Sequence, residues 1–139
     1  MTQAINRAAE ARDIERGKRV MAKLWPHFRR EVVESIVKRL FPEHEAGEIR
    51  QILNDYQGDS EEGSSRIHLD ALKLSDGSRE KLREKIKAAK QDSREVILPA
   101  ENPKSTDLGW VAYLRLSDEE KDRVTNEDLN QYLNWIEKR

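Results

Sequence analysis

The feature that most constrains the fold is an amphipathic segment in residues 27–41. Its large apolar side chains recur every fourth residue, which places them on one face of an α-helix. They are Phe28, Val32, Ile36 and Leu40, with Val33, Val37 and Phe41 beside them. Charged side chains fill the rest of the surface, and Pro42 ends the pattern. The segment therefore predicts a helix that buries one face against other elements.

Helical spacing also extends through most of the remaining chain. Residues 4–25 predict a first helix with a narrow apolar side, on which Ile14 and Met21 lie. Shorter helices are predicted over 44–57, 66–75, 79–91 and about 93–100, then from Ser117, and finally from a cap at Thr125. Residues 109–116 fit either a helix or a strand, because Val111, Tyr113 and Leu116 also favour strands.

Two polar segments interrupt these patterns and predict loops. They are residues 58–65, with the sequence GDSEEGSS, and residues 101–108, with the sequence ENPKSTDL. The chain is therefore expected to be one all-α domain over 1–139, a compact multi-helix bundle of seven to nine short helices with little or no β-structure. Residues 1–25 are expected to form an N-terminal helical arm.

The composition excludes several classes of protein. Charged residues make up 38% of the chain and the mean hydropathy is −0.93, so no segment resembles a membrane helix. The net charge is only −1, so self-repulsion does not oppose folding. The chain has no Cys, which excludes disulfides, thiolate nucleophiles and cysteine metal sites. These features predict a cytoplasmic protein.

Three stretches within residues 49–103 resemble a group of small uncharacterised bacterial helical proteins. The stretches are IRQIL at 49–53, HLDALKLSDG at 68–77, and AKQDSREV at 89–96 through Asn102 and Pro103. The group has no catalytic motif and no known activity. The resemblance implies a bacterial origin and an all-helical fold.

No catalytic motif is recognisable in the sequence. His44 and Glu48 have the spacing at which two side chains can share a metal ion on a helix, but two ligands do not make a tight site. The chain has no phosphate-binding glycine loop, no nucleophilic serine motif and no calcium loop. We therefore expect no enzyme activity and no cofactor or metal.

Positive charge forms two rows at helical spacing. One row lies on the helix over 4–25, and its members are Arg12, Arg16, Arg19 and Lys23. The other lies on the helix that begins at residue 79, provided that this helix continues through residue 94, and its members are Arg79, Arg83, Lys87, Lys90 and Arg94. Such rows can contact nucleic-acid phosphates. They can also be solvated faces that pair with the acidic block at residues 42–62, and this second arrangement is the commoner one.

Trp135 lies outside the apolar face of the last predicted helix, so we expect it to be exposed and to contact a partner. With the separated charge blocks and several amphipathic faces, this favours a non-enzymatic protein-interaction or regulatory module. The module would bind a protein partner or self-associate, with a homodimer as one form. The alternative is a nucleic-acid-binding helical protein that uses the two basic rows.

Overall fold

The computed structural model of the protein describes residues 2–138, with side chains from residue 7 onward, and contains nine α-helices and no strand within that range. The helices are α1 (Thr2–Leu24), α2 (Arg30–Leu40), α3 (Ala46–Asn54), α4 (Glu61–Ser75), α5 (Arg79–Gln91), α6 (Arg94–Glu101), α7 (Pro103–Leu108), α8 (Trp110–Leu114) and α9 (Asp118–Glu137). The predicted all-α bundle is confirmed. None of the described helices is long and apolar enough to cross a membrane.

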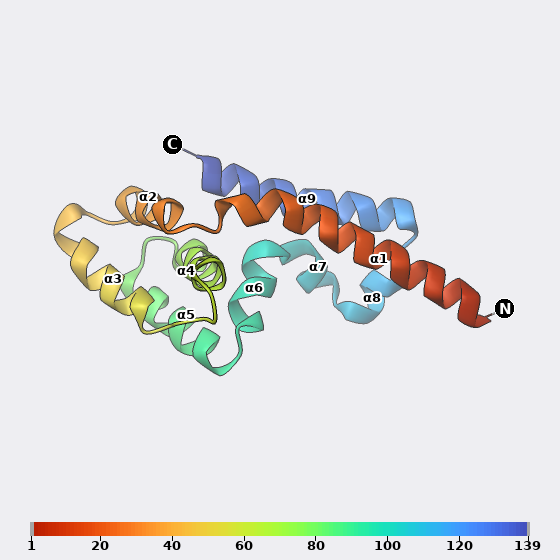
Figure 1. The fold of residues 1–139 in the computed structure, drawn as a ribbon, viewed down its shortest axis with the longest axis horizontal. Coiled ribbons are helices and arrows are strands. Elements are labelled where there is room, and N and C mark those ends of the chain that lie inside the picture. The colour runs from red at the N-terminus through yellow and green to blue at the C-terminus, as the bar shows by residue number, and fades with distance from the viewer. Residues whose placement is uncertain (1, 139) are drawn as a thin grey trace.

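The helices are arranged around α4 at one end of the molecule and around the α1–α9 pair along its length. α4 packs against α2, α5 and α6, while α1 and α9 run side by side. α6 and α7 also contact α9, and α8 follows α7 beneath α1 (Figure 1). The first and last helices of the chain therefore lie side by side and parallel, with the two termini at opposite ends of the pair.

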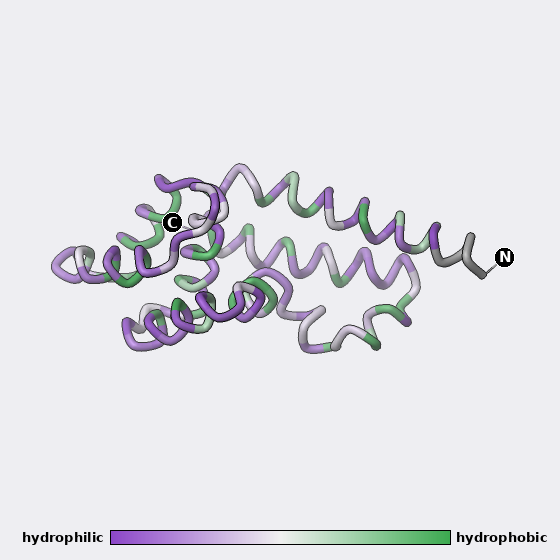
Figure 2. Tube along the Cα trace, turned by 60° about the horizontal axis from the view of Figure 1, so that its bottom comes forward, coloured by the Kyte–Doolittle hydropathy of each residue, from purple (hydrophilic) through white to green (hydrophobic). Residues whose placement is uncertain are grey.

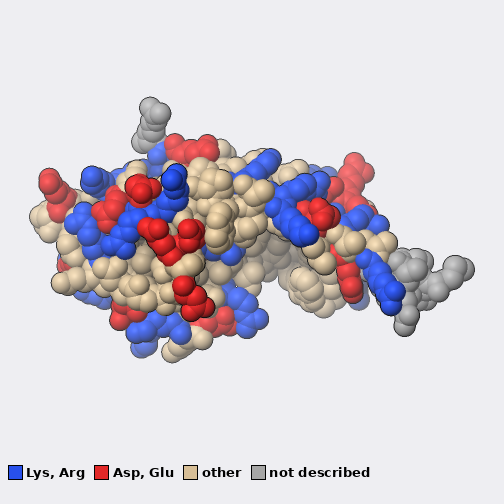
Figure 3. All heavy atoms as spheres, viewed as in Figure 1, with Lys and Arg blue, Asp and Glu red and all other residues tan. Residues whose placement is uncertain are grey.

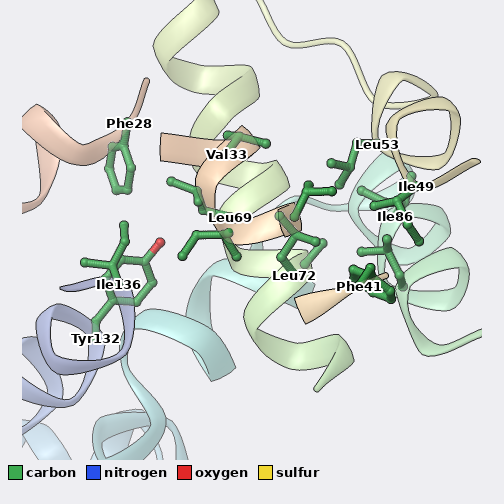
Figure 4. Close-up of a cluster of buried hydrophobic side chains, with 14 of the residues drawn as sticks. Phe28, Val33, Phe41, Ile49, Leu53, Leu69, Leu72, Ile86, Tyr132 and Ile136 are labelled. Atoms are coloured by element: carbon green, nitrogen blue, oxygen red, sulfur yellow. The ribbon is translucent and has the colours of Figure 1, made fainter. Parts of the chain in front are cut away.

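The core is centred on α4, where Leu69 and Leu72 are fully buried. Figure 4 shows side chains of five other segments converging on them, namely Phe28, Val33, Phe41, Ile49, Leu53, Ile86, Tyr132 and Ile136. Each fully buried side chain of this size contributes about 1.5–3 kcal/mol of hydrophobic free energy. The apolar stripe predicted over 27–41 is part of this core, because Val33, Ile36 and Val37 of α2 are all buried.

The start of that predicted helix lies three residues later in the structure. Trp25, Pro26 and His27 form a 3-10 turn, and α2 begins at Arg30. Phe28 is nevertheless fully buried, with its ring edge against Trp25 at a centroid distance of 6.0 Å. Proline has no N–H to donate, so it is tolerated in such a turn between two helices.

α1 is held to α9 mainly by charged groups. Arg16 is buried, and its guanidinium donates to Asp13 at 2.6 Å and to Asp122 of α9 at 2.8 Å. The Lys121 ammonium, also buried, lies 3.3 Å from the Asp13 carboxylate. In Figure 2 hydrophobic residues are interspersed among hydrophilic ones along α1. The narrow apolar side of the helix is supplemented by an ion network.

Two segments that we predicted as loops are partly helical. α4 begins at Glu61, inside the predicted loop 58–65, because the Ser60 hydroxyl accepts a hydrogen bond from the Gly63 N–H and caps the helix. Residues 103–108 of the predicted loop 101–108 form α7. Its first N–H groups are satisfied by a carboxylate from α9, a partner that is distant in sequence.

The ambiguous segment 109–116 contains the helix α8 and no strand. Gly109 separates α8 from α7 with a φ of +87°, a conformation that residues with a Cβ rarely adopt. The predicted cap at Thr125 is wrong, because α9 is continuous through that position. Ser117 and Glu120 form a capping box at its start, and no Gly or Pro interrupts the twenty residues that follow.

Candidate docking site

The basic row predicted over 79–94 pairs largely with acidic groups on neighbouring segments. The guanidiniums of Arg79 and Arg83 both bond the carboxylate of Glu48 on α3, the former at 2.8 Å. Lys90 lies 3.2 Å from Asp55, and Arg94 bonds Asp92. Lys87 has no ion pair with another described side chain. Arg79, Arg83 and Lys90 therefore connect α5 to the acidic block at 42–62. The expectation of one helix through residue 94 is wrong, because α5 ends at Gln91 and Arg94 begins α6.

The basic row on α1 shows the same behaviour. Arg12 lies 2.8 Å from Asp118, and Arg19 lies 3.4 Å from Asp122, next to the buried Arg16. Lys23 alone of the row lacks an ion pair among the described residues. The structure thus places most of both rows in intramolecular ion pairs, which leaves little unbalanced positive charge for phosphates.

The expectation that Trp135 is exposed is wrong. Its ring packs against Tyr132 at a centroid distance of 5.7 Å, and the Arg39 guanidinium lies over it at 5.2 Å. Arg39 also donates to the backbone carbonyls of Trp135 and Lys138, both at 2.7 Å, at the end of α9. The most exposed tryptophan is instead Trp110 on α8, with 73% of its surface accessible.

Trp110 borders a groove of about 530 Å³ that lies between α1, α6, α7, α8 and α9, which we call the α1–α8 groove. Its apolar lining comes from Val20 and Met21 of α1, Leu98 of α6, and Trp110 and Tyr113 of α8. In Figure 3 the surface is hollowed beneath α1, beside the largely uncharged lobe formed by α7 and α8. The groove is therefore an open apolar depression between helices.

Most polar groups along the groove are already satisfied within the chain. Arg66 donates two hydrogen bonds to the carboxylate of Glu101, at 2.8 and 2.6 Å. Thr106 donates to the Leu98 carbonyl at 3.1 Å, and the Tyr113 hydroxyl lies 3.4 Å from that of Thr125. The lining consequently offers apolar contacts more than polar ones. An occupant with an uncharged, apolar face fits this chemistry best.

The helices that form the groove also carry nearly all the exposed large hydrophobic side chains of the described residues. These are Ile14 on α1, Leu98 on α6, Leu108 on α7, and Trp110, Val111 and Leu114 on α8, with Trp25 as the one exception. Neither α7 nor α8 contains a buried residue. The apolar surface thus extends beyond the groove itself, as at protein-interaction sites.

The α7–α8 lobe is held by side chains of α9. The carboxylate of Asp128, itself buried, accepts hydrogen bonds from the N–H groups of Lys104 and Ser105, at 2.8 and 3.2 Å, and from the Ser105 hydroxyl at 2.7 Å. The Lys121 ammonium lies 5.5 Å from the centre of the Tyr113 ring. The lobe is therefore fixed by polar contacts on one side while its apolar side faces solvent.

Behind the groove, a cluster of acidic groups lies in the interior. Asp70 of α4 is fully buried, and both of its oxygens lack a hydrogen bond to another described residue, as does the Tyr132 hydroxyl. Burial, followed by the nearby carboxylate of Glu101, raises the pKa of Asp70 well above its ordinary value. A protonated Asp70 can donate to Glu101, whose charge is balanced by Arg66. The arrangement therefore favours the neutral form of Asp70.

Sequence reasoning missed both the groove and this cluster. The one signal for the cluster is an acid within an apolar helical stretch, because Asp70 stands between Leu69 and Ala71. Among the described residues, no three His, Asp or Glu side chains are grouped so that they could hold a metal ion. Glu48, the predicted neighbour of His44, is engaged by Arg79 and Arg83.

No family model, no curated protein and no solved structure matches this chain. The resemblance over residues 49–103 to uncharacterised bacterial helical proteins stays a prediction. A function for the chain therefore has to be argued from the geometry of the groove and of the surface around it.

Proposed function

We propose that this protein is a non-enzymatic interaction module that binds the apolar face of a helix from a protein partner in the α1–α8 groove. The observation that carries the proposal is the concentration of exposed hydrophobic side chains on the helices that form the groove. Trp110 and Val111 keep 73% and 61% of their surface exposed, so burial within the chain does not account for their being apolar. Binding of a partner helix would explain why these exposed side chains are apolar.

The composition of the surface supports a protein occupant. Tryptophan is enriched among the residues that dominate protein–protein binding, and Trp110 is the most exposed large hydrophobic residue described. The apolar surface continues past the groove to Val111 and Leu114, further than a small ligand would need. An amphipathic helix inserts residues at i, i+3 and i+4 into such a groove and covers its rim as well.

The ion pairs that line the groove favour a partner whose inserted face is uncharged. Asp13 and Arg16 pair on one wall, and Arg66 and Glu101 pair on another. An inserted charge would have to displace one member of a pair and leave the other member uncompensated. We also propose a cytoplasmic location, since a chain without Cys gains nothing from an oxidising compartment.

The proposal is tested with Nile red, an uncharged dye whose fluorescence rises in apolar sites, at concentrations where sedimentation shows a monomer. We expect the native chain to bind the dye and the double variant Trp110→Ser/Leu114→Ser to lose most of the signal. The matched control is Trp25→Ser, which removes an exposed tryptophan outside the groove and should retain dye binding. The double variant should unfold within a few degrees of the native chain, because Trp110 and Leu114 are 73% and 44% exposed and little buried surface is lost.

Two results would contradict the proposal. One is an absence of dye binding to the native chain. The other is a clear loss of stability in the double variant, which would assign Trp110 and Leu114 to folding instead of docking.

A further inference from the structure

Gly17 lies in the interior of α1, which continues through it to Leu24. Glycine is the least favourable residue in a helix interior apart from proline, because its backbone loses the most conformational freedom on folding. No contact within the chain requires a glycine here. Apart from the adjacent residues and the backbone of the helix itself, a Cβ added at this position has no described atom within 4 Å. Folding therefore gives no reason for the missing side chain.

Most of the other glycines are explained by contacts or backbone angles within the chain. Two have a positive φ angle, and at two others a Cβ would lie 3.2 or 3.1 Å from an atom of another residue; they are Gly77 and Gly109, and Gly58 and Gly63. Only Gly47 resembles Gly17 in having open space around it. It lies in the first turn of α3 and does not line the α1–α8 groove. Gly17 is therefore the one glycine whose open space lies at the groove.

Gly17 belongs to the face of α1 that forms a wall of this groove. The lining residues of α1 follow helical spacing and share one face, and they are Asp13, Arg16, Gly17, Val20 and Met21. The two charged members pair with each other at 2.6 Å. Leu98 of α6 and Trp110 of α8 add apolar side chains to the same lining. The wall thus has a gap at the exposed residue Gly17, which we call the Gly17 notch.

The Gly17 notch has the chemistry to accept a large apolar side chain. A helix that binds in a groove inserts apolar anchor residues at i, i+3 and i+4. An anchor placed over Gly17 contacts the α1 backbone and gains dispersion contacts with Val20 and Met21, which follow one turn later in the same wall. A charged anchor is disfavoured, because the charges of Asp13 and Arg16 already balance each other.

We infer that Gly17 determines the specificity of the docking site, because it admits a bulky apolar anchor residue of the partner helix, such as leucine or phenylalanine, into the wall formed by α1. This inference rests on the proposed function, since it names the side chain that the partner inserts. It predicts that a large side chain at residue 17 blocks the partner, and that a smaller anchor tolerates the blocked site.

The test uses synthetic helices that are selected on the native chain. A display library of amphipathic helices, randomised among apolar residues on one face, is selected for binding to the native chain and against the Trp110→Ser/Leu114→Ser variant. Each selected peptide is then titrated against Gly17→Leu. We expect its affinity to fall at least about tenfold, because the added side chain excludes the anchor. The matched control is Gly47→Leu, the same substitution at an exposed position on α3, which should leave the affinity unchanged.

An exchange of side-chain size then identifies the anchor. Each selected peptide is shortened to alanine at one apolar position at a time. At the anchor position, this change should weaken binding to the native chain at least about tenfold, yet alter binding to Gly17→Leu by less than about twofold. The reason is that the leucine at residue 17 fills the space that the anchor vacates. Such non-additivity reports direct contact between the two positions.

Thermal unfolding separates a blocked groove from a folding defect. Gly17→Leu should raise the melting temperature by about 2–5 °C, because leucine is the better helix former and the position is open. A variant that lost binding through misfolding would melt below the native chain. A lower melting temperature would overturn the inference, since it would show that the chain itself needs a glycine at residue 17.

The outcomes distinguish this inference from the proposed function. Selected peptides that bind the native chain and Gly17→Leu with equal affinity would overturn the inference and leave the docking site in place. Additive effects at every peptide position would also overturn it. A selection that yields no peptide dependent on Trp110 and Leu114 would overturn both.

Discussion

Asp70 of α4 and Glu101 of α6 place two carboxyl groups next to each other in the protein interior, where the Arg66 guanidinium bonds Glu101 and Asp70 has no hydrogen bond to another described residue. Two buried like charges beside one cation are unfavourable, so burial and the neighbouring Glu101 raise the pKa of Asp70. The other ionisable groups that act on Asp70 are Tyr132 of α9 and Lys73, one turn further along α4. Three helices thus contribute to one buried ionisable cluster.

We predict that this cluster makes the protein less stable as the pH rises. The pKa of Asp70 is raised in the folded state, so between about pH 4 and that raised value the unfolded chain releases a proton that the folded chain keeps. The free energy of unfolding should therefore fall with pH in this range, by up to about 1.4 kcal/mol per pH unit from this group. Asp70→Asn should remove this contribution.

The measurement is denaturant unfolding of the native chain and of Asp70→Asn across the same pH series. Carboxylates with lowered pKa values, such as Asp92, Asp122 and Glu127, lose stabilising interactions at low pH in both proteins. The difference between the two curves isolates Asp70, since the other groups are common to both. Parallel curves would show that Asp70 is ionised in the folded protein.

We predict that loss of Arg66 is among the most destabilising single changes in the chain. Arg66→Met leaves the nearly buried Glu101 carboxylate without its cation and should cost about 3–5 kcal/mol of unfolding free energy. Adding Glu101→Gln to that variant should recover much of the loss, because it removes the uncompensated charge. The control is Arg50→Met, which breaks the more exposed pair with Glu34 and should cost far less.

This prediction is checked by a double-mutant cycle in urea. If Arg66→Met and Glu101→Gln destabilise additively, the two side chains do not interact in the folded protein.

We predict that Asp128 determines the order of the α7–α8 lobe. Asp128→Ala removes the acceptor for the Lys104 and Ser105 N–H groups and should cost about 1–2 kcal/mol, comparable to the loss of a helix cap. Amide hydrogen exchange should accelerate in residues 103–114 and remain unchanged in α4. The control is Ser117→Ala, which removes a cap at the start of α9 and should affect that helix alone. Unchanged exchange in α7 would mean that other contacts hold the lobe.

We predict no retardation of duplex DNA in a gel-shift assay even at low salt, because Arg79, Arg83 and Lys90 are already paired with acidic side chains. The alternative function, nucleic-acid binding through the basic rows, predicts the opposite. It requires retardation that weakens with salt and with Lys23→Gln/Lys87→Gln, the two row members that lack an ion pair among the described residues. Retardation with that salt dependence would favour the alternative over a protein-docking module.

The helical elements could be predicted where a local pattern has one physical interpretation. The stripe from Phe28 to Phe41 is compatible only with a helix that is covered on one side, and the structure covers it with α4. The turn at Asp76 and Gly77 and the cap at Ser78 were also predictable, because left-handed backbone and N-terminal amides favour those residue types. Such signals act within a few residues of each other.

Features that depend on distant partners were not predictable. Trp135 lies off the apolar face of its helix, and it is covered because Arg39 of α2 extends over it. The polar sequence of residues 103–108 predicts a loop. In the structure these residues form a helix, because Asp128 on α9 caps its first N–H groups. The groove forms between helices that are far apart in sequence, because α1 and α8 both contribute residues to its lining.

By itself, the sequence determined the helical class, the approximate positions of the helices and the charge rows, since hydrophobic periodicity and capping act over one or two turns. Tertiary structure alone decided that most members of those rows would form ion pairs, that burial would raise the pKa of Asp70, and that Trp110 would be exposed beside a groove. The physical reason is that burial and ion pairing depend on which helices meet. That choice minimises the free energy of the whole chain, and no local segment encodes it.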